Sequence, residues 1–85
     1  MKREKTKEYS LDHVNKRLKE RFELPPMTMK DFDYLSNQLK IDKSYMILVE
    51  NGDQEIHQLI YHGKKVTFVF SNDREYITTV MKWIS

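Results

Sequence analysis

The sequence predicts an α+β fold, with two N-terminal helices packed on a four-stranded antiparallel meander in the order ααββββ. Up to about residue 42, apolar residues recur at the three- and four-residue spacing of amphipathic helices. After residue 44 they form short runs rich in strand-forming residues, separated by polar turns. One of these turns is Asn51-Gly52, a pair typical of tight hairpins.

The first helix is expected to begin after Ser10, because serine is a favourable N-cap residue. It should end near Glu23, because Pro25 and Pro26 cannot continue a helix. Four apolar residues at helical spacing predict the face that packs on the sheet, namely Leu11, Val14, Leu18 and Phe22.

The second helix is expected to begin after Thr28 and to fade at residues 40–42. Thr28 and Asp31 have the spacing of a capping box, with aspartate in place of the usual glutamate or glutamine. The buried face of this helix should consist of Met29, Phe32, Leu35 and Leu39.

Four strands are expected, over residues 45–49, 54–61, 65–70 and 76–84. His62-Gly63 should form the second tight turn of the meander, and the polar segment 71–74 the third. One face of such an antiparallel sheet takes the helices, and the other is partly exposed. Polar side chains on that second face are therefore candidates for a functional role.

The length of 85 residues fits one domain, preceded by a charged segment without periodicity. Residues 1–9 are predicted to form a flexible basic arm, and residues 10–85 a single α+β domain. The chain contains neither a run of about 18 apolar residues nor the apolar segment of a signal peptide. We therefore expect a cytoplasmic protein that makes no contact with a membrane.

Several kinds of site are absent from the sequence. It has no cysteine, which excludes disulfides and thiolate metal sites. It also shows no spacing typical of metal ligands, no glycine-rich phosphate loop and no Ser or Cys nucleophile motif. We therefore expect no metal, no cofactor and no covalent acyl chemistry.

Positive charge is concentrated at the start of the chain, although the net charge is only +2. Residues 1–21 contain eight lysines and arginines but four acidic residues, so the remainder is slightly acidic. A basic arm followed by a basic helix favours an anionic partner, most commonly a nucleic acid. A solubilising tail would have the same composition, so the charge pattern leaves both interpretations open.

The most informative pattern is the recurrence of His13, Arg17 and Arg21 at four-residue intervals in the first helix. This spacing places the three side chains on one stripe beside the apolar face. A histidine that exchanges protons near neutral pH, beside two permanent cations, suits a site that binds or cleaves a phosphodiester. Alternatively, both arginines cover apolar surface with their stems and pair with carboxylates such as Glu20 or Glu23.

Further candidate residues lie in the strands. Thr78 and Thr79 are neighbours in the last strand, so they should point to opposite faces, and one of them could bind an oxyanion. Aromatic side chains interleaved with basic ones, Arg74 among them, could stack single-stranded bases. The residues predicted to bind substrate are His57, Tyr61, Lys64 and Tyr76. Threonines and aromatics are also ordinary strand formers, which is the structural alternative for Thr78, Thr79, Tyr61 and Tyr76. For His57 the alternative is a surface histidine whose hydrogen bonds are satisfied without a ligand.

The first part of the chain resembles small phage and mobile-element proteins related to the RelE-like toxins. The shared features are the helical stripe of one histidine and two arginines, the short break after it, and a second helix that starts with Thr28 and Asp31. The later part of those proteins has a turn glycine before a strand and a final Ile-Thr-Val-like strand, as do Gly63–Phe70 and Tyr76–Val80. The resemblance covers most of residues 10–81. This sheet carries fewer basic residues than those of ribosome-dependent RelE toxins, which speaks against ribosome dependence.

This resemblance implies membership of the barnase–EndoU–colicin–RelE fold group, in which two helices pack on a four-stranded antiparallel sheet. Many members are metal-independent ribonucleases, and many are paired with a protein inhibitor. By this resemblance, His13 would be the general acid or base, while Arg17 and Arg21 would hold the scissile phosphate. Thr78 or Thr79 would orient the phosphate or the histidine.

We therefore predict a RelE-like RNA-binding protein that acts as a metal-independent endoribonuclease and has a cognate antitoxin or a host protein as a further partner. The alternative is a non-catalytic phage or mobile-element interaction module that binds and inhibits a host protein through its exposed sheet face or an edge strand. A DNA-binding regulator is a weaker third interpretation, because Pro25 and Pro26 separate the helices too far for a helix-turn-helix motif.

Overall fold

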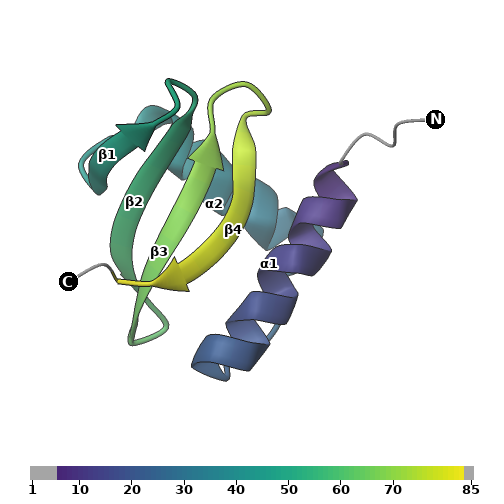
Figure 1. Ribbon diagram of the computed structural model, residues 1–85. Helices are drawn as coiled ribbons and strands as arrows, with labels where there is room; N and C mark the ends of the chain where they lie inside the picture. Colours follow the sequence, from purple (N-terminus) through teal and green to yellow (C-terminus); the bar gives the residue numbers. More distant parts are fainter. Residues whose placement is uncertain (1–5, 84–85) are drawn as a thin grey trace.

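In the computed structural model, which describes residues 6–83, two helices precede a four-stranded antiparallel sheet with strand order β1-β2-β3-β4 (Figure 1). The predicted α+β, ααββββ architecture is therefore confirmed. The elements are α1 (Lys7–Phe22), α2 (Met29–Ile41), β1 (Met46–Glu50), β2 (Gln54–Tyr61), β3 (Lys64–Ser71) and β4 (Tyr76–Lys82). None of the described helices is long and apolar enough to cross a membrane.

The first helix begins earlier than the sequence pattern predicts. Thr6, rather than Ser10, is the N-cap of α1, and its side chain accepts a hydrogen bond from the Tyr9 backbone N–H at 3.1 Å. Ser10 is buried inside the helix, where its backbone N–H donates to the Thr6 carbonyl oxygen. The helix therefore includes Lys7–Tyr9, which were expected in the basic arm, and residues 1–5 of that arm lie outside the described residues.

Side chains fix the connection between the two helices. Glu23 ends α1 in the left-handed conformation, with φ of 55°. The Asn15 side chain bonds both backbone polar groups of Met27, at 2.8 and 3.0 Å, and ties the connection to α1. Thr28 and Asp31 form the predicted capping box at the start of α2. These contacts satisfy backbone groups that a helix end would otherwise leave unpaired.

One apolar core fills the space between the helices and one face of the sheet. α2 crosses behind the sheet, whereas α1 lies alongside β4 at the edge of the sheet (Figure 1). Helix and strand residues share this core, among them Val14, Leu18, Phe22, Phe32, Leu39, Val66, Phe68, Phe70, Ile77 and Val80. Because α1 packs on an edge strand, the residues beside its apolar stripe lie next to β4.

Both tight turns predicted for the meander are present. Asn51 and Gly52 have φ of 55° and 70°, and His62 and Gly63 have φ of 50° and 78°. Two successive positive φ values are the signature of the type I′ turn, whose twist suits antiparallel hairpins. β2 has the predicted bounds, and the ends of the other strands differ from the predicted ones by at most two residues. Residue 84, predicted in the last strand, lies outside the described part of the chain.

The last strand contains a β-bulge that the sequence pattern does not reveal. Val69 of β3 pairs with Thr79, but the next residue of β3 pairs with Ile77, so Thr78 is an extra residue in β4. An extra residue interrupts the regular alternation of side chains between the two faces. Ile77 and Val80 are consequently both fully buried in the core, although they are three positions apart.

Candidate functional site

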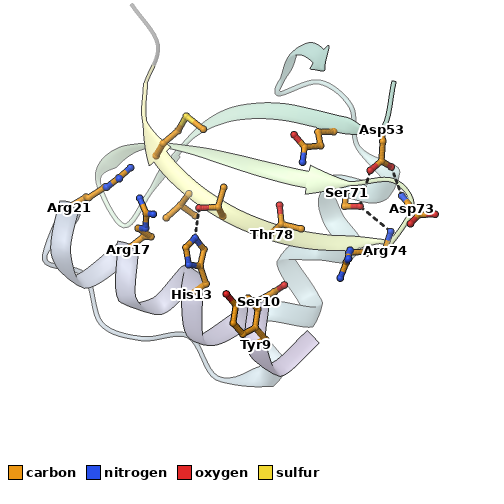
Figure 2. A pocket seen from close by; sticks show the side chains of 14 residues that line it. Tyr9, Ser10, His13, Arg17, Arg21, Asp53, Ser71, Asp73, Arg74 and Thr78 are labelled. Carbon is orange, nitrogen blue, oxygen red and sulfur yellow. Dashed lines mark hydrogen bonds between the residues drawn. The ribbon is translucent and has the colours of Figure 1, made fainter. Parts of the chain in front are cut away.

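A groove with a volume of about 680 Å³ runs between α1 and the β4 edge of the sheet, and we call it the α1–β4 groove (Figure 2). Its helix wall consists of Tyr9, Ser10, His13, Arg17 and Arg21. Its strand wall consists of Thr78, Thr79, Val80 and Met81. The turns and neighbouring strand ends contribute Asp53, Gln54, Ser71, Asp73 and Arg74.

The five residues predicted to be catalytic all line this groove. His13, Arg17 and Arg21 project from α1, and Thr78 and Thr79 from β4. The expectation that the two threonines point to opposite faces is wrong, because the bulge at Thr78 allows both to line the groove. The fold thus brings the helical stripe and the last-strand threonines to one place.

His13 lies between Arg17 and Thr78 along the groove (Figure 2), and its ring contacts Thr79 of β4. The Nε2 atom of His13 is 3.1 Å from the Oγ1 atom of Thr79, and both residues are half-buried. Because a hydroxyl can donate or accept a hydrogen bond, the contact is compatible with either neutral tautomer of the imidazole. The contact fixes the position of the ring relative to β4.

Arg17 and Arg21 follow His13 along α1, and each four-residue step advances about 6 Å along a helix axis. Arg17 is half-buried and Arg21 is exposed. Among residues 6–83, neither arginine takes part in an ion pair, which argues against pairing with Glu20 or Glu23. Their guanidinium donors are therefore available to a bound anion, which they can grip with two parallel hydrogen bonds.

The two threonine hydroxyls in the groove have different surroundings. Thr78 Oγ1 donates to the Val69 carbonyl oxygen at 3.3 Å and thereby pairs a backbone group at the bulge. Thr79 Oγ1 instead contacts the imidazole ring of His13. Of the two threonines, Thr79 is therefore the one placed to orient the histidine, and Thr78 stabilises the bulge.

Asp53 holds the turn at the other end of the groove in place. Its carboxylate accepts hydrogen bonds from the Asp73 backbone N–H at 2.8 Å and from the Ser71 hydroxyl at 3.4 Å. The Ser71 hydroxyl oxygen in turn accepts from the Arg74 backbone N–H at 3.1 Å. This chain of contacts fixes the backbone from which Arg74 reaches the groove (Figure 2).

No pattern in the sequence indicated Tyr9 or Asp53 as a groove residue. Arg74 was expected only as one of the basic residues between the sheet aromatics. The only local signal for Arg74 is a cation in a polar turn directly before a strand, which many solvated turns share. Its place in the groove depends on where α1 packs, and no local pattern specifies that.

Two of the residues predicted to bind substrate lie in the interior, and we correct both predictions. His57 is 0% exposed, and its Nε2 atom contacts the Glu55 carboxylate at 2.9 Å. Tyr76 is 8% exposed and packs on Phe32, with ring centroids 6.1 Å apart. Strand alternation places His57 on the helix-facing side of β2, so it cannot serve as a second proton carrier in the groove.

The other two predicted substrate-binding residues also lie outside the groove. Tyr61 is half-buried at the end of β2 and packs edge-to-face on Phe68, with ring centroids 5.5 Å apart. Burial and the nearby Asp31 raise the pKa of its hydroxyl. Lys64 is exposed at the tight turn between β2 and β3. Neither residue lines the α1–β4 groove, and a role of either in substrate binding stays a prediction.

Glu55 is the centre of a second polar cluster, on the helix-facing side of the sheet. Its carboxylate accepts hydrogen bonds from Lys43 Nζ at 2.7 Å, from His57 Nε2 at 2.9 Å and from Asn72 Nδ2 at 2.8 Å. Burial by itself raises the pKa of Glu55, but these hydrogen bonds outweigh it and hold the pKa below its usual range. The cluster joins three segments of the chain and has a structural role.

No group of three or more metal-binding side chains is present among the described residues. Comparison of the chain with protein-family models, with curated protein sequences and with solved structures finds no match. The groove's own chemistry is therefore the basis for a functional assignment. It combines one imidazole, three guanidinium groups and two threonine hydroxyls in one partly enclosed space.

Proposed function

We propose that the protein is a RelE-like, metal-independent endoribonuclease whose active site is the α1–β4 groove. The observation that supports this proposal best is the contact between His13 and Thr79, with Arg17 and Arg21 following on the same helix face. A histidine held beside two arginines can move a proton and neutralise phosphate charge at the same place.

In the proposed reaction, the 2′-hydroxyl of an RNA nucleotide attacks the adjacent phosphorus. A P–O bond to the 2′-oxygen forms and the P–O bond to the 5′-oxygen of the next nucleotide breaks. The products are a 2′,3′-cyclic phosphate and a 5′-hydroxyl. One proton leaves the attacking hydroxyl and one joins the leaving oxygen. His13 performs one of these transfers and solvent the other.

The arginines have a separate role in this reaction. Negative charge on the non-bridging oxygens increases as the phosphorus becomes five-coordinate. In the proposed reaction, Arg17, which is half-buried and about one turn from His13, holds these oxygens, and Arg21 extends the cationic surface by a further turn. Preorganised donors of this kind stabilise charge that develops in a transition state.

Cleavage of purified total RNA in the presence of EDTA tests the proposal. Wild-type protein should cleave it, and His13→Ala should be slower by about 100- to 10,000-fold, the usual contribution of a positioned acid or base. Lys30→Gln removes an exposed cation of α2 outside the groove and is the matched control. Full activity in His13→Ala would exclude the proposed role of this residue.

The second candidate function is a non-catalytic module that binds and inhibits a host protein. It is favoured by β1, an edge strand whose Ile47, Leu48 and Val49 are 39–48% exposed. Exposed apolar edge strands are sites where another chain can add a strand. Such an interface should tolerate added salt, whereas RNA binding should weaken steeply with salt concentration.

A further inference from the structure

We infer that Arg74 is a second phosphate-binding side chain, so that the groove takes a single-stranded RNA segment extending beyond the cleaved bond. This inference rests on the proposed ribonuclease function and adds to it the length of substrate that the site recognises. Arg74 would bind a phosphate at the end of the groove that His13, Arg17 and Arg21 of α1 do not reach.

The cationic side chains occupy both ends of the groove. Figure 2 shows Arg21 and Arg17 on one side of His13, and Arg74 on the other side, beyond Tyr9 and Thr78. His13, which Thr79 contacts, therefore lies between two cationic ends of the groove. A single phosphate at His13 can contact the arginines of α1, but the far end requires another anionic group of the same ligand.

The backbone around Arg74 is held in place. Asp53 accepts hydrogen bonds from the Asp73 backbone N–H and the Ser71 hydroxyl, and Ser71 accepts from the Arg74 backbone N–H. The guanidinium is further located by the Tyr76 hydroxyl, 3.5 Å from Nη1. A cation on a fixed backbone loses less conformational entropy on binding than one on a mobile turn.

The remaining side chains at this end define the ligand further. Tyr9 is 52% exposed beside the path from His13 to Arg74 and can stack an unpaired base. The carboxylates of Asp53 and Asp73 lie at the end of the groove and would repel a phosphate placed beyond Arg74. These features fit a short, single-stranded segment and disfavour a duplex, whose bases are stacked on one another.

The test compares cleavage of a dinucleoside monophosphate with cleavage of a pentanucleotide that contains the same cleavable step. Arg74→Gln should lower kcat/KM for the pentanucleotide by about tenfold, the loss expected for one charge-assisted contact, and leave the dinucleoside unchanged. Arg17→Gln should slow both substrates. Lys30→Gln should slow neither, and Arg74→Lys should restore part of the pentanucleotide rate because it keeps the charge.

Salt dependence gives a second readout that a folding defect does not imitate. Arg74→Gln should reduce the slope of log affinity against log salt for the pentanucleotide by about 0.7, the value for one phosphate contact on a single strand. If wild type cleaves RNA but Arg74→Gln changes neither quantity, or slows both substrates equally, the inference is wrong and the proposed function stands. If the wild-type protein neither binds nor cleaves either substrate, the proposed function itself fails.

Discussion

His13 Nε2 lies 3.1 Å from Thr79 Oγ1, and this contact joins the first helix to the last strand across 66 positions of sequence. The contact lies next to a bulge in β4, in which Thr78 is an extra residue directly before Thr79. A helix histidine thus meets a strand hydroxyl beside a backbone irregularity of the sheet. Bulges near functional sites commonly redirect a side chain.

Thr79→Val should reduce RNA cleavage by about tenfold, because it removes one hydrogen bond to the histidine while nearly keeping the side-chain shape. Single-turnover cleavage of a defined oligonucleotide measures the effect. Thr79→Ser keeps the hydroxyl and should retain most of the activity. Equal rates for wild type and Thr79→Val would show that the contact does not contribute to the reaction.

Thr78→Val should act on stability more than on the reaction, because the Thr78 hydroxyl donates to the Val69 carbonyl oxygen. Loss of this hydrogen bond should lower the free energy of unfolding by about 1 kcal/mol. Urea denaturation measures the change. A loss of cleavage without any loss of stability would instead assign Thr78 a direct role at the phosphate.

Arg17→Gln should weaken RNA binding by about tenfold or more and reduce the salt slope by about 0.7, since one phosphate contact on a single strand is lost. Fluorescence anisotropy with a labelled, non-cleavable oligonucleotide over a range of salt concentrations gives both quantities. Lys30→Gln, outside the groove, should behave as wild type. An unchanged slope in Arg17→Gln would mean that this side chain does not contact a phosphate.

Glu55 should make stability depend on pH. Its pKa in the folded protein lies below the ordinary value of 4.5, so its contribution to stability is present above that pH and is lost as the pH falls through the folded-state pKa. Glu55→Gln should lower the free energy of unfolding at pH 7 by about 1–3 kcal/mol and flatten its dependence on pH below 5. Thermal unfolding at several pH values measures both effects.

Asp33→Asn is the control for that prediction, because it removes an ion pair with Lys7 in which both side chains are nearly half exposed. Exposed pairs contribute about 0–1 kcal/mol, so this variant should unfold almost as wild type does. A loss as large as that of Glu55→Gln would contradict the structural role assigned to the buried cluster.

Local signals in the sequence were sufficient to predict the order and type of the elements. The Thr28/Asp31 capping box and the Asn51-Gly52 turn are each specified by neighbouring residues, and both occur as predicted. The predicted start of α1 was wrong because Thr6 and Ser10 are both acceptable N-cap residues. The longer helix is favoured because it also pairs backbone groups of Lys7–Tyr9.

The parts of the site that could not be predicted depend on tertiary packing. The bulge in β4 has no sequence signature, so Thr78 and Thr79 were expected on opposite faces. Strand alternation correctly assigns His57 to one face of the sheet, but the sequence does not say which face the helices cover. The helices cover the face that carries His57, so this side chain is buried. Arg74 enters the groove only because α1 packs beside β4.

The most direct test of the central claim is the rate and the product of cleavage of one defined single-stranded oligonucleotide in EDTA, by wild type and by His13→Ala. We predict wild-type cleavage that leaves a 2′,3′-cyclic phosphate and a 5′-hydroxyl, and a rate at least about 100-fold lower in the variant. Equal rates in the two proteins, products with a 5′-phosphate, or no cleavage by either protein would contradict it.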